Sequence, residues 1–134
     1  FIDMKILGIG VDIVENSRIT KSLSNKLFLK RIFSNSEILI AKKIKDKKSY
    51  YSKRFAAKEA FAKSIGTGFS NGLNFKDISV INNKAGKPSF VITNKIKKII
   101  KDNFKVSSFS FFLSISDEKN YSIAFVILQK NNAR

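Results

Sequence analysis

The segment RFAAKEAFAKSIGTG at positions 54–68 places charged side chains within an otherwise apolar stretch. Glu59 is its one carboxylate, and Arg54, Lys58 and Lys63 are its cations. At about 100° per residue, Arg54 and Lys58 fall inside the apolar arc of a helix, and Glu59 falls at the edge of that arc. Charges on a helix face that packs against other elements need partners, so this segment is a candidate binding or catalytic site.

A second carboxylate, Asp12, follows two glycines in the segment GIGVDI at positions 8–13. The period-two pattern of a strand puts Gly8, Gly10 and Asp12 on one face, and the bare glycines leave room for a helix there. Asp12 could then meet Glu59 at the edge of the core. Two neighbouring carboxylates repel each other, and a divalent cation that prefers oxygen ligands reverses that repulsion. The pair therefore predicts a Mg²⁺ site, because Mg²⁺ characteristically combines one or two carboxylates with substrate phosphates.

Two interpretations of the cations on the helix remain open. In the structural one, Glu59 pairs with Lys63 four residues on, while Arg54 and Lys58 extend their charged ends around a neighbouring element. In the functional one, the cations and the GTG turn at 66–68 bind a phosphate-rich ligand. The helix by itself favours the structural interpretation, and the addition of Asp12 favours the functional one.

The composition excludes several kinds of site. The chain of 134 residues contains neither cysteine nor histidine. Disulfides, thiolate metal sites and catalysis by Ser–His or Cys–His pairs are therefore excluded, and any metal must have oxygen ligands. No apolar run reaches the roughly 20 residues that span a bilayer. We expect a cytoplasmic protein that does not bind membranes.

The charge balance points to an anionic partner. Lys and Arg number 26 against 10 Asp and Glu, a net charge of +16. Such a charge suits nucleic acid, a phosphorylated cofactor or an acidic protein, although a lysine-rich genomic bias also produces it. A small basic nucleic-acid-binding protein is the alternative from another functional class. We expect no nucleic acid, because the phenylalanines alternate along predicted strands as core residues do and no RNA-binding signature is present.

The elements that must position these residues follow from periodicity and turn signals. The predicted strands are 4–14, 76–81, 88–93, 108–116 and 121–129, and the predicted helices lie within 15–33, 34–44, 50–65 and 94–104. Most helices come in a block after the first strand. We therefore expect an α+β fold, a single compact domain with a mainly antiparallel sheet packed by helices.

The expected domain spans residues 4–130. Met4 is the one methionine, so we expect residues 1–3 to be an addition ahead of the natural start. The polar residues 131–134 are expected to form a frayed C-terminus.

Four segments in this order resemble the holo-(acyl-carrier-protein) synthase family of small bacterial 4'-phosphopantetheinyl transferases. They are GIGVDIVENSRI, KRFAAKEAFAKSIGTG, AGKPSF and SISDEKNYSIAFVIL, which together extend over nearly the whole chain. The resemblance implies the 4'-phosphopantetheinyl transferase fold and the transfer of 4'-phosphopantetheine from coenzyme A to a serine of apo acyl carrier protein. The second product is adenosine 3',5'-bisphosphate, the cofactor is Mg²⁺, and the pathway is fatty acid biosynthesis. A broad-specificity transferase acting on synthase carrier domains is a related alternative, but such enzymes usually resemble two fused copies of this unit.

The resemblance also implies roles for individual residues. Asp12 and Glu59 match metal ligands that hold the coenzyme A diphosphate, and Lys63 matches a lysine at this phosphate region. The other positions expected to bind coenzyme A are Arg54, at the adenosine 3'-phosphate, and Lys58, Gly66, Thr67, Gly68, Pro88, Ser116 and Asp117. Arg18 matches a basic residue that contacts the acidic helix of the carrier protein. Because the family is typically a homotrimer with sites at subunit interfaces, Ser116 and Asp117 of one chain are expected to complete the pocket of a neighbour.

Asp117 departs from the many family members that have histidine at this position. An aspartate cannot donate a hydrogen bond to a phosphate at neutral pH, but it can accept a proton, orient a lysine or bind metal-bound water. It can also simply begin the DEKN turn. The proton of the attacking serine thus has three possible acceptors: Glu59, Asp117 or a metal-bound water. The stronger positional match favours Glu59.

Overall fold

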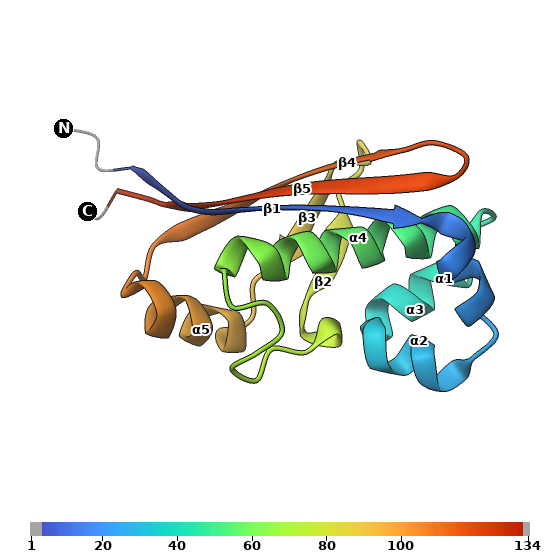
Figure 1. The fold of residues 1–134 in the computed structure, drawn as a ribbon, viewed down its shortest axis with the longest axis horizontal. Coiled ribbons are helices and arrows are strands. Elements are labelled where there is room, and N and C mark those ends of the chain that lie inside the picture. The colour runs from blue at the N-terminus through green and yellow to red at the C-terminus, as the bar shows by residue number, and fades with distance from the viewer. Residues whose placement is uncertain (1–3, 133–134) are drawn as a thin grey trace.

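A long central helix, α4 (Lys47–Ile65), lies along one face of a three-stranded antiparallel sheet (Figure 1). The strand order is β1 (Lys5–Glu15), β5 (Tyr121–Lys130) and β4 (Phe109–Asp117). These elements are those of a computed structural model, which describes residues 4–132. The expectation for residues 1–3 lies outside the described residues. In the described part of the chain, no helix combines the length and apolar character needed to cross a membrane.

Helix α4 has clear start and stop signals. The side chain of Asp46 accepts a hydrogen bond from the backbone N–H of Ser49, which caps the first turn. The helix ends where Gly66 adopts a left-handed conformation with φ of 89°. The helix therefore begins three residues before the predicted Tyr50, and its predicted end at Ile65 is confirmed.

Strand β1 packs on α4 through its glycine face. A Cβ atom added at Gly8 would lie 1.7 Å from the backbone oxygen of Ser64, and one added at Gly10 would lie 1.8 Å from that of Ala60. Only glycine permits this approach of strand to helix. The predicted alternation is confirmed from Gly8 to Ile13, and Ile9, Val11 and Ile13 face away from α4. Leu7, predicted on the same outer face, instead packs against the core beside a register shift.

The chain between β1 and α4 forms three short helices at one end of the molecule (Figure 1): α1 (Asn16–Ser22), α2 (Lys26–Ile32) and α3 (Asn35–Ala41). The predicted helical stretch 15–33 is divided because Asn25 caps a new helix, accepting hydrogen bonds from the backbone of Leu27 and Phe28. The predicted capping box of Ser34 and Glu37 is confirmed.

The second half of the chain adds a hairpin, which contacts both α3 and α4, and a helix at the other end of α4. The 3₁₀ turn η1 (Phe75–Asp77) precedes the antiparallel pair β2 (Ser79–Asn82) and β3 (Pro88–Val91). Helix α5 (Asn94–Phe104) follows and buries its isoleucine face. The predicted α+β class with antiparallel sheets is confirmed by these elements.

The core lies between α4 and the inner face of the sheet. Phe61 of α4 is fully buried and stacks on Phe111 of β4, with ring centroids 4.3 Å apart. The sequence predicts fraying from residue 131, but Asn131 hydrogen-bonds the carbonyl of Ser108 at 2.9 Å and the hydroxyl of Ser110 at 2.9 Å. Residues 133–134 lie outside the described part of the chain.

Candidate functional site

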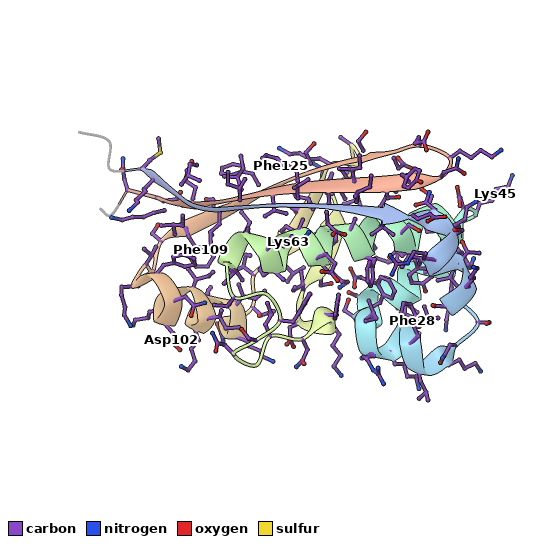
Figure 2. The ribbon with its side chains drawn as sticks, viewed as in Figure 1. Phe28, Lys45, Lys63, Asp102, Phe109 and Phe125 are labelled. Atoms are coloured by element: carbon purple, nitrogen blue, oxygen red, sulfur yellow. The ribbon has the colours of Figure 1, made fainter. Side chains whose placement is uncertain are left out.

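The two predicted carboxylates meet at one cavity. Asp12 of β1 and Glu59 of α4 both line a hollow of about 620 Å³, which α1 and α2 also border. Lys63 and Arg18 line the same cavity. In Figure 2, Lys63 lies on α4 beneath the sheet, and Phe28 lies among the short helices. The structure therefore brings together four predicted residues from three elements.

The position of Asp12 follows from the packing of β1. It shares the inner face of the strand with the two glycines, so the close approach at Gly10 carries Asp12 to the next turn of α4. The Lys63 ammonium lies 3.2 Å from Asp12 Oδ1 and donates to the carbonyl oxygen of Val11 at 3.0 Å. Within residues 4–132, the ion pair of Lys63 is thus with Asp12, and the alternative pairing of Lys63 with Glu59 is wrong.

Both carboxylates are held in surroundings that disfavour their charge. Burial raises the pKa of Glu59, the nearby Asp12 carboxylate raises it further, and Lys63 opposes the increase. Burial likewise raises the pKa of Asp12, against the hydrogen bond and charge of Lys63 and the charge of Arg18. A cation bound by the two carboxylates would offset the cost of burying their negative charges close together.

The donor set fits Mg²⁺. Asp12 and Glu59 offer carboxylate oxygens, and no group of three or more potential metal-binding side chains exists in the described residues. Mg²⁺ is typically coordinated by one or two protein carboxylates, and water molecules and substrate phosphates supply the other ligands of its octahedral shell. The site therefore suits a cation that arrives with a phosphorylated ligand.

Neutralising Glu59 should stabilise the metal-free protein. A carboxyl with a raised folded-state pKa favours folding below its ordinary pKa near 4.5, and this contribution is lost as the pH rises through the folded-state value. Glu59→Gln should therefore raise the Tm by a few degrees at about pH 7.5 and leave it unchanged at about pH 4. Thermal unfolding followed by circular dichroism in a chelator measures both values. An unchanged Tm at the higher pH would show that the two carboxylates do not repel.

Arg54 lies away from these carboxylates. It lines a separate cavity of about 520 Å³ with Lys53 and Asn82. Its guanidinium lies over the ring of Tyr50, 3.8 Å from the centroid, and donates to Asn82 Oδ1 at 2.5 Å. Its buried Nε has no hydrogen-bond partner among the described residues, so one donor remains for a ligand. Asn82 pairs with Pro88 across the β2–β3 hairpin, which places Pro88 on this side of the molecule.

The prediction that Lys58 binds coenzyme A is wrong for this structure. Its side chain is fully buried, and its ammonium pairs with Glu37 Oε1 at 2.7 Å. It also donates to the carbonyl oxygens of Ile78 and Phe75. Three acceptors satisfy all three donors of the ammonium, so none is left for a ligand. Burial lowers the pKa of Lys58, and Glu37 opposes this decrease.

The remaining predicted positions do not line the Asp12 cavity. Gly66, Thr67 and Gly68 follow the C-terminus of α4, where Gly68 also has a positive φ of 59°. Ser116 is opposite Ile123 on the outer face of the sheet. Asp117 accepts a hydrogen bond from the Ser49 hydroxyl at 2.9 Å, so it contacts the first turn of α4 rather than a lysine.

Two aromatic residues of the cavity were missed by the sequence reasoning. Phe28 of α2 and Phe55 of α4 form an apolar wall beside Glu59. Phe55 lies four residues before Glu59, so the helical spacing contained the signal, but an apolar residue in a packing arc looks like core. The sequence offered no signal for Phe28, because its position depends on how α2 folds back.

Comparisons with known proteins show the family to which this chain belongs. The 4'-phosphopantetheinyl transferase superfamily matches residues 8–126. The chain is 76% identical over 127 residues to a holo-(acyl-carrier-protein) synthase of Pelagibacter ubique, covering 95% of this chain and 99% of that one.

Solved structures share the fold. The holo-(acyl-carrier-protein) synthase of Neisseria meningitidis superposes with a TM-score of 0.82 at 36% identity, covering 92% of this chain and 98% of that one. The enzyme of Bacillus anthracis, in complex with CoA (3',5'-ADP), gives 0.79 at 35% identity, covering 94% and 98%.

Proposed function

This chain belongs to the 4'-phosphopantetheinyl transferase superfamily, and from that membership we propose that it catalyses the holo-(acyl-carrier-protein) synthase reaction. The enzyme transfers 4'-phosphopantetheine from coenzyme A to a serine of apo acyl carrier protein and releases adenosine 3',5'-bisphosphate. The observation that carries the proposal is the meeting of Asp12 and Glu59 at one cavity. We extend the proposal to fatty acid biosynthesis in the cytoplasm, as the family resemblance implies.

Each charged residue of the cavity has its own role in the proposed reaction. The serine hydroxyl attacks the phosphorus that bears the pantetheine arm, and the bond to the leaving phosphate breaks. Asp12 and Glu59 would hold a Mg²⁺ ion, which when bound would neutralise charge on the diphosphate. Glu59 also accepts the serine proton as the general base. Lys63, now paired with Asp12, is placed to bind the negative charge of the leaving group.

The surroundings of the cavity suit an acidic protein substrate. Arg18 and Lys21 line it on the α1 side, and both side chains are exposed. An acidic carrier-protein helix would be attracted to these cations, and apolar side chains next to its serine could contact Phe28 and Phe55. We assign Arg18 to carrier-protein binding on this basis.

Mass spectrometry of an apo acyl carrier protein tests the proposed function directly. The carrier protein is incubated with this protein, coenzyme A and Mg²⁺, and a matched sample contains a chelator. A gain of one phosphopantetheine group, absent from the chelator sample, is the expected result. No gain, from a folded protein that binds coenzyme A, would refute the proposal.

An apolar outer face of the sheet supports assembly as a homotrimer. On the side opposite α4, Val11 pairs with Phe125 and Ile13 with Ile123 across β1 and β5 (Figure 2 labels Phe125). Val11 is 54% exposed and Phe125 is 41% exposed in the single chain. Ile9, Ile127 and Phe112 continue this apolar face. A contiguous apolar face of this kind marks an interface, and we assign it to further copies of this chain.

Assembly would also explain why the positions expected to bind coenzyme A are dispersed. Asp12 lines one cavity, while Arg54 lines another. We propose that the active site lies between subunits, with Asp12, Glu59 and Lys63 from one chain. The neighbour would supply Arg54, the 66–68 turn, Pro88 and the residues at the end of β4, Ser116 and Asp117.

A charge placed on the outer face should break the assembly. Phe125→Lys puts an ammonium group at the centre of the apolar face, so we expect analytical ultracentrifugation to show monomers in place of trimers, with little remaining transfer activity. Asn103→Lys, which adds the same charge at the exposed end of α5, should leave both unchanged. A wild-type protein that sediments as a monomer would contradict the proposed trimer.

A further inference from the structure

A buried ion pair adjoins the candidate site without lining its cavity. Glu37 of α3 and Lys58 of α4 lie 2.7 Å apart, and their side chains are 1% and 0% exposed. Lys58 directly precedes Glu59 on α4, so this pair is joined by one peptide bond to the proposed metal ligand and base.

The Glu37 carboxylate connects three elements. It accepts hydrogen bonds from the backbone N–H of Ser34 at 2.9 Å, which caps α3, and from the backbone N–H of Val80 in β2 at 3.0 Å. Its third partner is Lys58 of α4. Loss of this carboxylate would therefore remove the hydrogen bonds and the ion pair by which it joins α3, β2 and α4.

The Lys58 ammonium adds a second set of attachments. It donates to the carbonyl oxygens of Phe75 in η1, at 3.2 Å, and of Ile78 just before β2. Its donors therefore bind groups from two separate stretches of chain, around residues 37 and 75–78. A side chain fixed in this way resists both rotation of α4 about its axis and sliding of α4 along it.

The opposite side of α4 is held by β1. The contacts of Gly8 and Gly10 with Ser64 and Ala60 bring the strand against the helix backbone, but they lie on the C-terminal side of Glu59 and include no side chain that directs it. The direction of Glu59 lies about 100° from that of Lys58, because the two are consecutive in an α-helix. A fixed Lys58 thereby fixes the direction in which Glu59 points.

We propose that Lys58 and Glu37 are positioning residues, which set the rotation of α4 so that Glu59 faces Asp12. This inference rests on the proposed function for its catalytic consequence. Stability alone is a weak explanation for the pair, because replacing a buried ion pair by uncharged groups of similar volume is often neutral or stabilising.

The same pair is connected to Arg54. The Tyr50 hydroxyl donates to the carbonyl oxygen of Glu37 at 2.7 Å, and the guanidinium of Arg54 lies over the Tyr50 ring. The buried pair therefore lies between the two cavities to which the predicted site residues belong. Removing the ion pair should weaken metal binding at the Asp12 cavity more than ligand binding at the Arg54 cavity, because Glu59 is the immediate neighbour of Lys58.

The test removes both charges at once. Lys58→Met alone leaves the Glu37 carboxylate buried without its partner, and such a variant can fail to fold. The double variant Glu37→Gln with Lys58→Met leaves no buried charge and keeps a side-chain oxygen for the backbone of Ser34. Glu37→Gln with Lys58→Gln, which also leaves no buried charge but keeps a side-chain donor at position 58 for the carbonyl oxygens of Phe75 and Ile78, is the second variant. Ile100→Val, at a fully buried position of α5 outside the site, controls for a loss of stability.

Three quantities are measured on each intact variant: the Tm, the Kd for Mn²⁺ from paramagnetic resonance of the free ion, and kcat with KM for coenzyme A. The Glu37→Gln, Lys58→Met variant should keep a Tm close to that of the wild type while its Kd for Mn²⁺ rises about tenfold and kcat falls, as for other groups that orient metal ligands. Glu37→Gln with Lys58→Gln should show a smaller rise in the Kd. Ile100→Val should lower the Tm and leave the Kd unchanged.

Two results would overturn the proposal. One is a Glu37→Gln, Lys58→Met variant with the Mn²⁺ affinity and kcat of the wild type, or the same result for Glu37→Gln with Lys58→Gln if the first variant does not fold. The other is a rise in the Kd of Ile100→Val equal to that of the Glu37→Gln, Lys58→Met variant, because lost stability would then account for the effect. A wild-type protein that modifies no carrier protein would refute the proposed function, and the Mn²⁺ affinities would still decide whether the pair positions Glu59.

Discussion

Replacing Glu59 by glutamine should lower kcat/KM for modification of the carrier protein by roughly 10³-fold. General-base catalysis alone contributes about 10²–10⁴-fold, and Glu59 is proposed to hold the metal as well. The amide keeps the size of the side chain but cannot accept the serine proton and has no negative charge for the cation. Steady-state kinetics with apo carrier protein, coenzyme A and saturating Mg²⁺ measure the change.

A matched substitution separates this effect from a general change in charge. Glu15→Gln removes an exposed carboxylate at the end of β1, where Glu15 accepts a hydrogen bond from Ser17. We expect less than a twofold change in kcat/KM, because a single exposed charge is largely screened. If Glu59→Gln retained most of its activity, Glu59 would be neither the base nor an essential ligand, and Asp117 would become the next candidate for the base.

Substituting Gly10 by alanine should have the largest effect on the fold. The new methyl group would lie 1.8 Å from the backbone oxygen of Ala60, and a helix backbone cannot rotate out of the way. We expect a loss of about 3 kcal/mol or more in the free energy of unfolding, the upper end for overpacking, and a fall in Tm of roughly 10 °C. The strand must move away from α4, so Asp12 would also move away from Glu59.

Chemical denaturation and Mn²⁺ binding measure the two consequences of Gly10→Ala. Gly72→Ala is the control, because Gly72 has a positive φ of 83° and a Cβ there meets no atom within 4 Å. It should cost only about 1 kcal/mol, the usual penalty of a left-handed conformation for alanine, and should leave Mn²⁺ binding unchanged. Equal losses in the two variants would show that the approach of β1 to α4 is unimportant.

The buried charges show the limit of reasoning from helix spacing. Periodicity placed Arg54 and Lys58 together in the apolar arc, and the functional interpretation, favoured once Asp12 was added, had both bind the same phosphorylated ligand. In the structure, Lys58 is fully enclosed by Glu37 and two carbonyl oxygens, while Arg54 lines a separate cavity. The partner that decides the role of Lys58 lies 21 positions away, and no local pattern identifies it.

Local patterns determined much of this protein without any tertiary information. The alternation along most of β1, the capping box at Ser34 and the end of α4 at Gly66 depend on neighbouring residues, and each was predicted correctly. The glycines of GIGVDI also predicted a strand face left bare for a helix, which made the meeting of Asp12 with Glu59 a reasonable hypothesis.

Only the tertiary structure decided which partner each charge found and which apolar face stayed exposed. Lys63 binds Asp12 rather than Glu59, because the glycine contact brings β1 closer to its ammonium. Ile9, Val11 and Ile13 of β1 are apolar, yet they face away from α4, because the helix packs on the side where no side chain stands in the way. Local sequence fixes the direction in which each side chain points, but long-range packing fixes what lies in that direction.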